Sequence, residues 1–205
     1  MGSTRVIESK GDKALRAPSL FLPPHSTCPD STMNMLGITF AALLLVATTA
    51  ARAEAPSDGQ IASIVVTANQ VDIDAGKLAI SKSRVDMVRA FARQMVADHS
   101  GVNKQAVELV TKLKVAPEDN PTSQSLKKGG DDNLKSLATL KGAAFDKAYI
   151  EHEIAYHAQV IDAIDKTLIP NAQSAELKAL LVSVRPAFVG HLEHAKQIQA
   201  SLGKN

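Results

Sequence analysis

The chain has 205 residues, of which 45% are hydrophobic, 21% are charged and 3% are aromatic, and its formal net charge is +2. This composition supports a buried core and excludes a wholly disordered chain. The near-neutral charge and the absence of Trp exclude a basic or base-stacking surface for nucleic acid. A single Cys excludes a disulfide framework and a multi-cysteine zinc or iron–sulfur site.

Residues 1–53 have the pattern of a leader rather than of a folded domain. The apolar run LGITFAALLLV covers 36–46, and Ala51-Arg52-Ala53 fits the A-x-A pattern of a signal-peptide cleavage site. We expect cleavage after Ala53 and export to the periplasm or the medium, with a short membrane anchor as the alternative. The polar stretch before the apolar run is either a long leader or lies upstream of a true start at Met33 or Met35.

Residues 54–205 form the expected domain, and their charges balance. Because the leader holds five basic and three acidic residues, this part has a formal net charge of zero. No polybasic surface for membranes or nucleic acid follows from that balance. No segment after residue 53 reaches the ~20 apolar residues of a membrane-spanning helix, so only peripheral association with the outer membrane stays open.

Apolar residues recur at intervals of three and four through this domain, as in helices that bury one face. They predict helices over about 57–81, from the capping-box-like Ser83–Asp86 to Leu113, from about Asp146 to a stop at Pro170, and over 177–202. Pro186 is expected to kink the last of these helices.

The lengths of the connections predict the topology. The first and second helices, and the third and fourth, have short links and must form antiparallel pairs. Between the pairs lies a long crossover, 116–141, with a short helical piece around 123–140 and a local break at the GGDD of 129–132. We therefore expect an all-α, ferritin-like four-helix bundle of two antiparallel hairpins joined by a long crossover that contains a short extra helix.

Three histidines fall on the apolar seams of three different helices, namely His99, His157 and His191. Neutral imidazole is a good ligand for zinc, copper and iron, so histidines that converge in a bundle core indicate a metal site. Counting ~1.5 Å of rise per residue puts Glu153 at the level of His99 and His191, with His157 one turn away. The same count places Asp72 roughly 9 Å from that level, where Val65 and Ala68 would face the histidines and offer no ligand.

The spacing excludes a di-iron carboxylate centre, which needs Glu-x-x-His on two helices. The residues three positions before the seam histidines are Val96, Ile154 and Phe188. We therefore predict one transition-metal ion, zinc, copper or iron, whose ligands come from His99, Glu153, His157 and His191. The alternatives left open are a purely structural hydrogen-bonded network of these residues in an interaction module, and a metal-dependent enzyme.

Other polar residues are weaker candidates. His152 and His194 lie off the seams and are expected to face solvent, and Asp98 should point some 100° away from His99. Asp146 lies in the first turn of its helix, where interaction with the helix dipole would account for it. Tyr149 is placed to offer a hydroxyl to the histidine network.

Three stretches of the domain, RAFARQMVADHSGVN, GAAFDKAYIEHEIAYHAQVIDAI and RPAFVGHLEHA, resemble a family of bacterial proteins of unknown function, DUF4142. The resemblance extends from about Ile61 to Leu202. It implies an exported ferritin-like bundle, often labelled an outer membrane protein, and implies no activity. The positions typical of the family are Asp98, His99, Asp146, His157 and His191.

Overall fold

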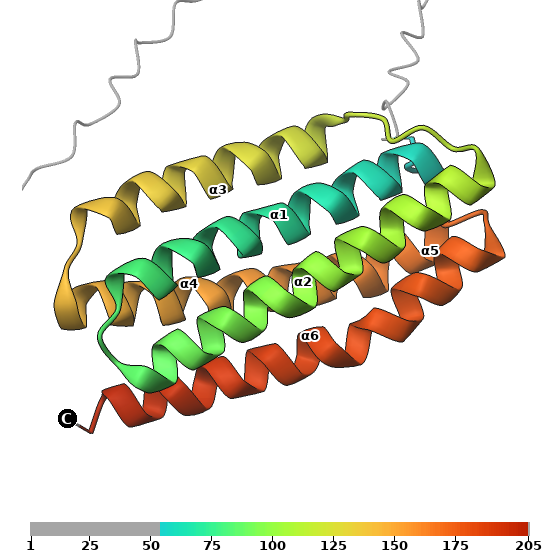
Figure 1. Cartoon of the computed structure of the whole chain (residues 1–205). Coiled ribbons are helices and arrows are strands. Elements are labelled where there is room, and N and C mark those ends of the chain that lie inside the picture. The colour runs from blue at the N-terminus through green and yellow to red at the C-terminus, as the bar shows by residue number, and fades with distance from the viewer. Residues whose placement is uncertain (1–53, 205) are drawn as a thin grey trace, which may run out of the picture. The chain divides into compact units, whose positions relative to one another are not determined.

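The computed structural model describes residues 54–204, and every regular element in this part is a helix. The expected signal sequence over 36–46 and the expected cleavage after Ala53 lie outside the described residues. The elements are α1 (Asp58–Lys82), α2 (Asp86–Leu113), α3 (Pro121–Thr139), α4 (Gly142–Ala163), the π-helix η1 (Ile164–Leu168), α5 (Ile169–Asn171) and α6 (Ala175–Leu202) (Figure 1).

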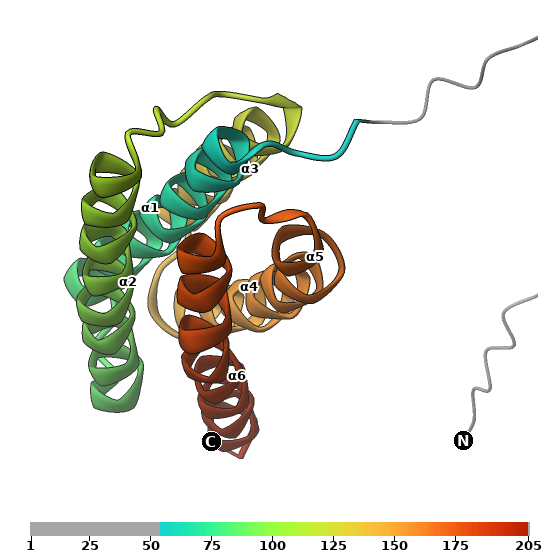
Figure 2. The same ribbon diagram turned by 90° about the vertical axis from the view of Figure 1, so that its right-hand side faces the viewer.

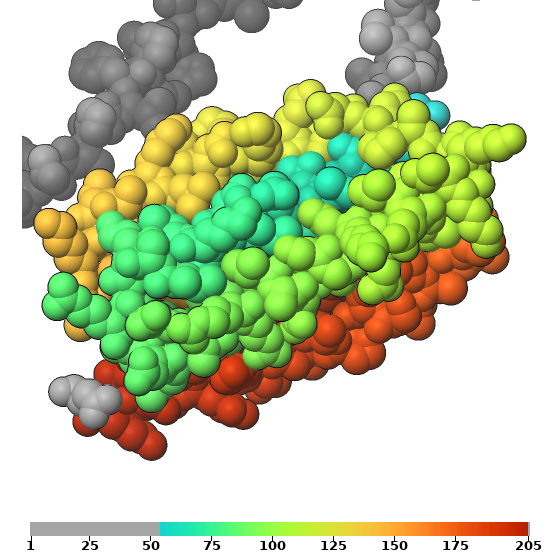
Figure 3. Space-filling model, in the orientation of Figure 1, coloured from blue at the N-terminus to red at the C-terminus, as the bar shows by residue number. Residues whose placement is uncertain are grey.

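The four long helices α1, α2, α4 and α6 form the bundle. α1 pairs with α2 and α4 with α6, while α2 contacts α6 and α1 contacts α4, so the two antiparallel hairpins close around a common core (Figures 1 and 2). The remaining helix, α3, packs on the outside of α1, and Figure 3 shows α3, α1, α2 and α6 following one another across one face. The expected all-α bundle with a helical crossover is confirmed.

The helix starts are capped by side chains at α1 and α3. Ser57 and Gln60 form a reciprocal capping box at α1, and Asn120 caps α3 before a proline at the first helical position. The capping box expected at Ser83 and Asp86 is absent, because α2 begins after Val85 without a side-chain cap. The Ser83 Oγ atom instead accepts the Val85 N–H at 3.1 Å, which stabilises the turn between α1 and α2.

The expected break at Gly129–Asp132 is wrong, because α3 runs through these residues without interruption. Lys127 and Lys128 make ion pairs with the aspartates one turn later, Asp131 and Asp132, and such pairs support a helix across the two glycines. Gly130 also brings α3 close to α1: a Cβ atom at this position would lie 2.6 Å from a methyl carbon of Val71.

Prolines do not end the helices as strictly as expected. α6 continues through Pro186 as one helix, and Pro170 lies inside the final turn, α5, rather than after it. The π-helix η1, which precedes α5, has no counterpart in the sequence-based expectation.

The core consists of two apolar clusters with polar side chains between them. One cluster contains Ile61, Leu181 and Phe188, and the other contains Phe91, Tyr149 and Ile198. No helix in the part of the chain described here is long and apolar enough to cross a membrane. The buried polar layer at mid-bundle is the feature that apolar packing does not explain.

Candidate metal centre

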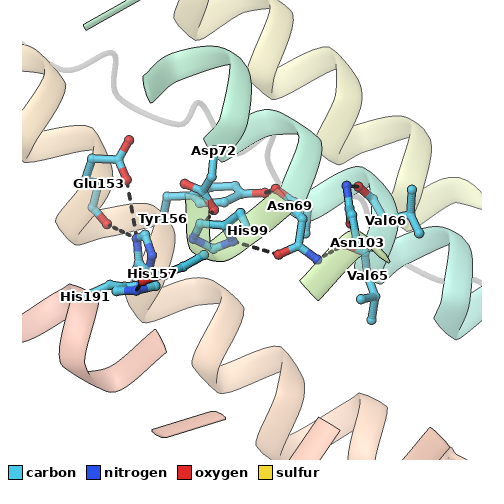
Figure 4. A network of polar contacts seen from close by, with 12 residues as sticks. Val65, Val66, Asn69, Asp72, His99, Asn103, Glu153, Tyr156, His157 and His191 are labelled. Carbon is cyan, nitrogen blue, oxygen red and sulfur yellow. Dashed lines mark hydrogen bonds and ion pairs between the residues drawn. The ribbon is translucent and has the colours of Figure 1, made fainter. Parts of the chain in front are cut away.

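The three seam histidines meet in the polar layer, one each from α2, α4 and α6 (Figure 4). The ring centroids of His99 and His157 are 5.6 Å apart, those of His99 and His191 5.3 Å, and those of His157 and His191 5.4 Å. One ring nitrogen of each lies within 4.8 Å of the other two, and all three side chains are buried. The structure thus brings together the three histidines that the sequence singled out.

An asparagine on α1 fixes the orientation of His99. The Asn69 Nδ2 atom donates to the Val65 carbonyl oxygen at 2.9 Å, which leaves the Asn69 Oδ1 atom to accept. The His99 Nδ1 atom lies 2.7 Å from that oxygen and therefore carries the proton. The lone pair of His99 is then on Nε2, and its ring orientation is held by a neighbour, as is usual for metal-ligating histidines.

The other two histidines are held in the same way. The His157 Nδ1 atom donates to the backbone carbonyl of Glu153 at 2.9 Å, and the His191 Nε2 atom lies 2.9 Å from the Asp98 Oδ2 atom. The opposite nitrogens, Nε2 of His99, Nε2 of His157 and Nδ1 of His191, are buried and have no hydrogen-bond partner among the described residues. Burying an unpaired polar atom costs about 1–3 kcal/mol, so three that converge call for a shared partner.

Two carboxyl groups complete the cluster, Glu153 on α4 and Asp72 on α1. Together with His157 they form a second set of ligand atoms within 4.8 Å of one another, and the Asp72 Oδ2 atom lies 3.5 Å from the His99 Nε2 atom. None of the four carboxyl oxygens has a hydrogen-bond partner within the described part of the chain. Glu153 lies where expected, and Asp72 is a member that the sequence analysis missed.

The expected 9 Å offset of Asp72 is wrong because the helix ends were misplaced. In the structure Asp72 lies ten residues before Lys82, the end of α1, and His99 lies thirteen residues after Asp86, the start of α2. Three residues correspond to about 4.5 Å along the axis, which an aspartate and an imidazole side chain span together.

Burial sets the charge states of the metal-free cluster. It raises the pKa of Asp72 from 3.8 to about 8, and burial together with the charge of Asp72 raises the pKa of Glu153 well above 4.5. Burial also lowers the pKa of His99 to about 2 and that of His157 to about 4. Burial lowers the pKa of His191 as well, against the opposing effect of Asp98. At neutral pH the imidazoles are therefore neutral, and the carboxyl groups keep protons.

Several residues around the cluster differ from expectation. Asp98 does not point away from the site but reaches His191 from the surface, with 46% of its side chain exposed. His152 is half-buried and its ring stacks on Tyr156, and His194 is half-buried against the ring of Phe91. Neither histidine therefore faces solvent fully, and neither belongs to the cluster.

Tyr149 and Tyr156 line the polar layer. Tyr149 is fully buried, and burial together with the charges of Glu153 and Asp72 raises its pKa well above 10, so its hydroxyl stays neutral. The Tyr156 hydroxyl donates to the Ala68 carbonyl at 3.1 Å, which ties α4 to α1 beside the cluster. Three neutral imidazoles and two carboxyl groups without hydrogen-bond partners form the donor set that zinc, copper(II) and iron take in proteins.

Two solved structures are similar to this chain at low sequence identity. A DUF305 protein from Streptomyces coelicolor that is thought to be secreted shares 12% identity with a TM-score of 0.61, covering 71% of this chain and 93% of that one. CopM in its Cu(II)-bound form shares 16% with a TM-score of 0.56, covering 72% and 99%. At such identities the likeness shows the helical fold alone.

The search among curated proteins gives no match. The model of a family described as a domain of unknown function, DUF4142, matches residues 45–198, which is most of the chain. This match agrees with the resemblance carried by the stretches around His99, His157 and His191. The chain belongs to the DUF4142 family.

Proposed function

We propose that the protein binds one divalent transition-metal ion at mid-bundle, with His99, His157 and His191 as nitrogen ligands. A carboxylate oxygen of Asp72 or Glu153 would complete a four-coordinate site. One observation carries this proposal: each histidine uses one ring nitrogen for an orienting hydrogen bond and leaves the other buried, without a partner and close to its two counterparts. A plain hydrogen-bonded network would have used these nitrogens.

The donor set favours borderline metals over calcium or magnesium, which take oxygen ligands. Among divalent ions, a nitrogen and oxygen site binds copper more tightly than zinc, in the general order of stabilities. The Cu(II)-bound state of CopM, a protein of similar fold, supports testing copper first. We therefore propose copper(II) as the tightest ligand and zinc as a weaker one.

The position of the site suggests metal storage or delivery as its role. The ligands come from α1, α2, α4 and α6, so a bound ion would join both hairpins of the bundle. Two deprotonated carboxylates would balance the charge of a divalent ion in the buried layer. Asp98 is the only polar neighbour of the three histidines that is substantially exposed in the described structure, which marks the α2–α6 surface as the side of entry.

Export is part of this proposal. It rests on the signal-peptide pattern that ends at Ala53 and agrees with the likeness to a protein thought to be secreted. Fractionation of cells that produce the full chain should place a product starting at Glu54 outside the inner membrane. Replacing Ala51 and Ala53 by bulky residues should leave the longer precursor. Retention of the unmodified chain in the cytoplasm would refute export.

Metal titration of the purified, tag-free protein after chelator treatment tests the binding site. We expect one equivalent of Cu²⁺ per chain, with binding reduced at least about 100-fold in His99→Ala and His191→Ala. His194→Ala is the matched control, because His194 lies on the same helix, three residues from His191 and outside the cluster. If wild-type protein binds no metal and the His99 and His191 variants only lose stability, the cluster is a structural network.

A further inference from the structure

A second buried carboxylate lies far from the histidines, at the end of the bundle where the α1–α2 turn, the start of α4 and the end of α6 meet (Figure 1). Asp146 is only 3% exposed, and its Oδ1 atom has no hydrogen-bond partner among the described residues. The N-terminal dipole of α4 favours a negative charge here, but it supplies no donor to that oxygen. A buried carboxylate without donors is costly, so this group lacks its partner.

Asp146 lines a cavity of about 550 Å³, a volume in the range of small-molecule sites. The cavity walls are largely apolar and include Met87 from α2, Ile150 from α4 and Leu202 from α6. Met87 is one of the few large apolar side chains that are exposed in the described chain, at 41%. The pocket therefore combines one buried negative group with apolar walls that are partly open to solvent.

The nearby cations do not neutralise Asp146. The Lys82 ammonium donates to backbone carbonyls at the end of α3, at 3.2 Å from the Leu137 oxygen, and also lies over the Phe145 ring. Lys147 lies 3.8 Å from Glu151 on the surface of α4. Arg84 lines the pocket, is exposed, and makes no ion pair with any described residue.

We propose that this pocket binds a small apolar α-amino acid as a zwitterion. The ammonium group would donate to the Asp146 carboxylate, and the apolar side chain would lie against Met87 and Leu202. The carboxylate would face Arg84, whose guanidinium is suited to hold carboxylates. A simple amine would satisfy Asp146 and leave Arg84 unpaired, and a simple carboxylate would leave Asp146 unpaired and add a second negative charge. This site is independent of the metal centre.

Three probes of similar shape separate these contributions. Leucine carries both charged groups, 3-methylbutylamine only the ammonium and 4-methylpentanoate only the carboxylate. Chemical shifts of the backbone amides in the ¹⁵N-labelled full chain report binding, since Gly142 and Gly203 line the pocket. We expect leucine to bind with a dissociation constant of about 1 mM or tighter, the amine at least about tenfold more weakly and the acid without measurable shifts.

Two variants assign the roles of the charged groups. Asp146→Asn keeps the size of the side chain and should weaken leucine binding at least about tenfold, with unchanged circular dichroism and unchanged metal binding. Arg84→Gln should weaken leucine binding while leaving amine binding as it was.

Three results would overturn the proposal: no shifts with leucine at 20 mM (roughly twentyfold the expected constant), shifts that persist in Asp146→Asn, or equal losses of stability in the Asp146 and Arg84 variants without ligand. The last result would mean that Arg84 folds inward and is itself the partner of Asp146.

Discussion

Replacing Asp72 by Asn should make the metal-free protein more stable at high pH and leave it little changed at low pH. The pKa of Asp72 rises from 3.8 to about 8 on folding, because the side chain is buried. Between these two values the folded protein holds a proton that the unfolded chain releases, so folding is opposed more strongly as the pH rises. An amide at position 72 does not ionise and escapes this penalty.

The size of the effect follows from the proton linkage. Each pH unit between the two pKa values costs about 1.36 kcal/mol of the free energy of unfolding. Between pH 5 and pH 8 the difference between Asp72→Asn and wild type should therefore shift by about 4 kcal/mol in favour of the variant. The lowered pKa values of the histidines act in the opposite direction below pH 6.5, but they are common to both proteins and largely cancel in the difference.

Urea unfolding followed by circular dichroism, with a chelator present and at half-unit steps of pH, measures this difference. Asp74→Asn is the matched control, because Asp74 lies on the same helix and pairs with Lys77 on the surface at 3.8 Å. Its pH profile should run parallel to that of wild type. If the Asp72→Asn profile also runs parallel to wild type, the carboxyl group of Asp72 does not keep its proton in the folded core, and the assigned charge state is wrong.

Further predictions concern the orienting residues, the protons and the packing of α3. Asn69→Ala removes the acceptor for the His99 Nδ1–H group and should lower metal affinity about 10–100-fold, whereas Asn103→Ala, whose amide contacts only a backbone carbonyl at 3.4 Å, should not. Metal binding at pH 7 should release protons from the carboxyl groups, and calorimetric heats that do not depend on the ionisation enthalpy of the buffer would contradict this. Gly130→Ala should lower the melting temperature, because its Cβ atom would lie 2.6 Å from Val71, while Gly129→Ala has free space and should raise stability by up to about 1 kcal/mol. Equal melting temperatures for the two glycine variants would contradict the close packing of α3 on α1.

The sequence predicts the architecture because helix periodicity and connection length are local properties. The apolar spacing identifies α1, α2, α4 and α6, and the long link after α2 requires a crossover. Helix ends are less well determined, since the capping residues of α2 and the glycines of α3 act through contacts that the pattern does not contain. An error of a few residues at the ends of α1 and α2 was enough to exclude Asp72 from the site.

The site was predicted in its histidines and missed in its supports. His99, His157 and His191 stand out because polar residues interrupt apolar seams, and the same signal could have identified Asn69 and Asp72, which are spaced three apart on the buried face of α1. Which ring nitrogen each histidine leaves free depends on neighbours such as Asn69 and Asp98 on other helices. Such partners follow only from three-dimensional packing.

Anomalous diffraction at the zinc and copper absorption edges, from crystals of metal-loaded protein, tests the central claim most directly. A single strong peak should lie about 2.0–2.1 Å from the His99 Nε2, His157 Nε2 and His191 Nδ1 atoms, with a carboxylate oxygen of Asp72 or Glu153 at a similar distance. Peaks confined to the surface, with no density between the three imidazoles, would contradict the account.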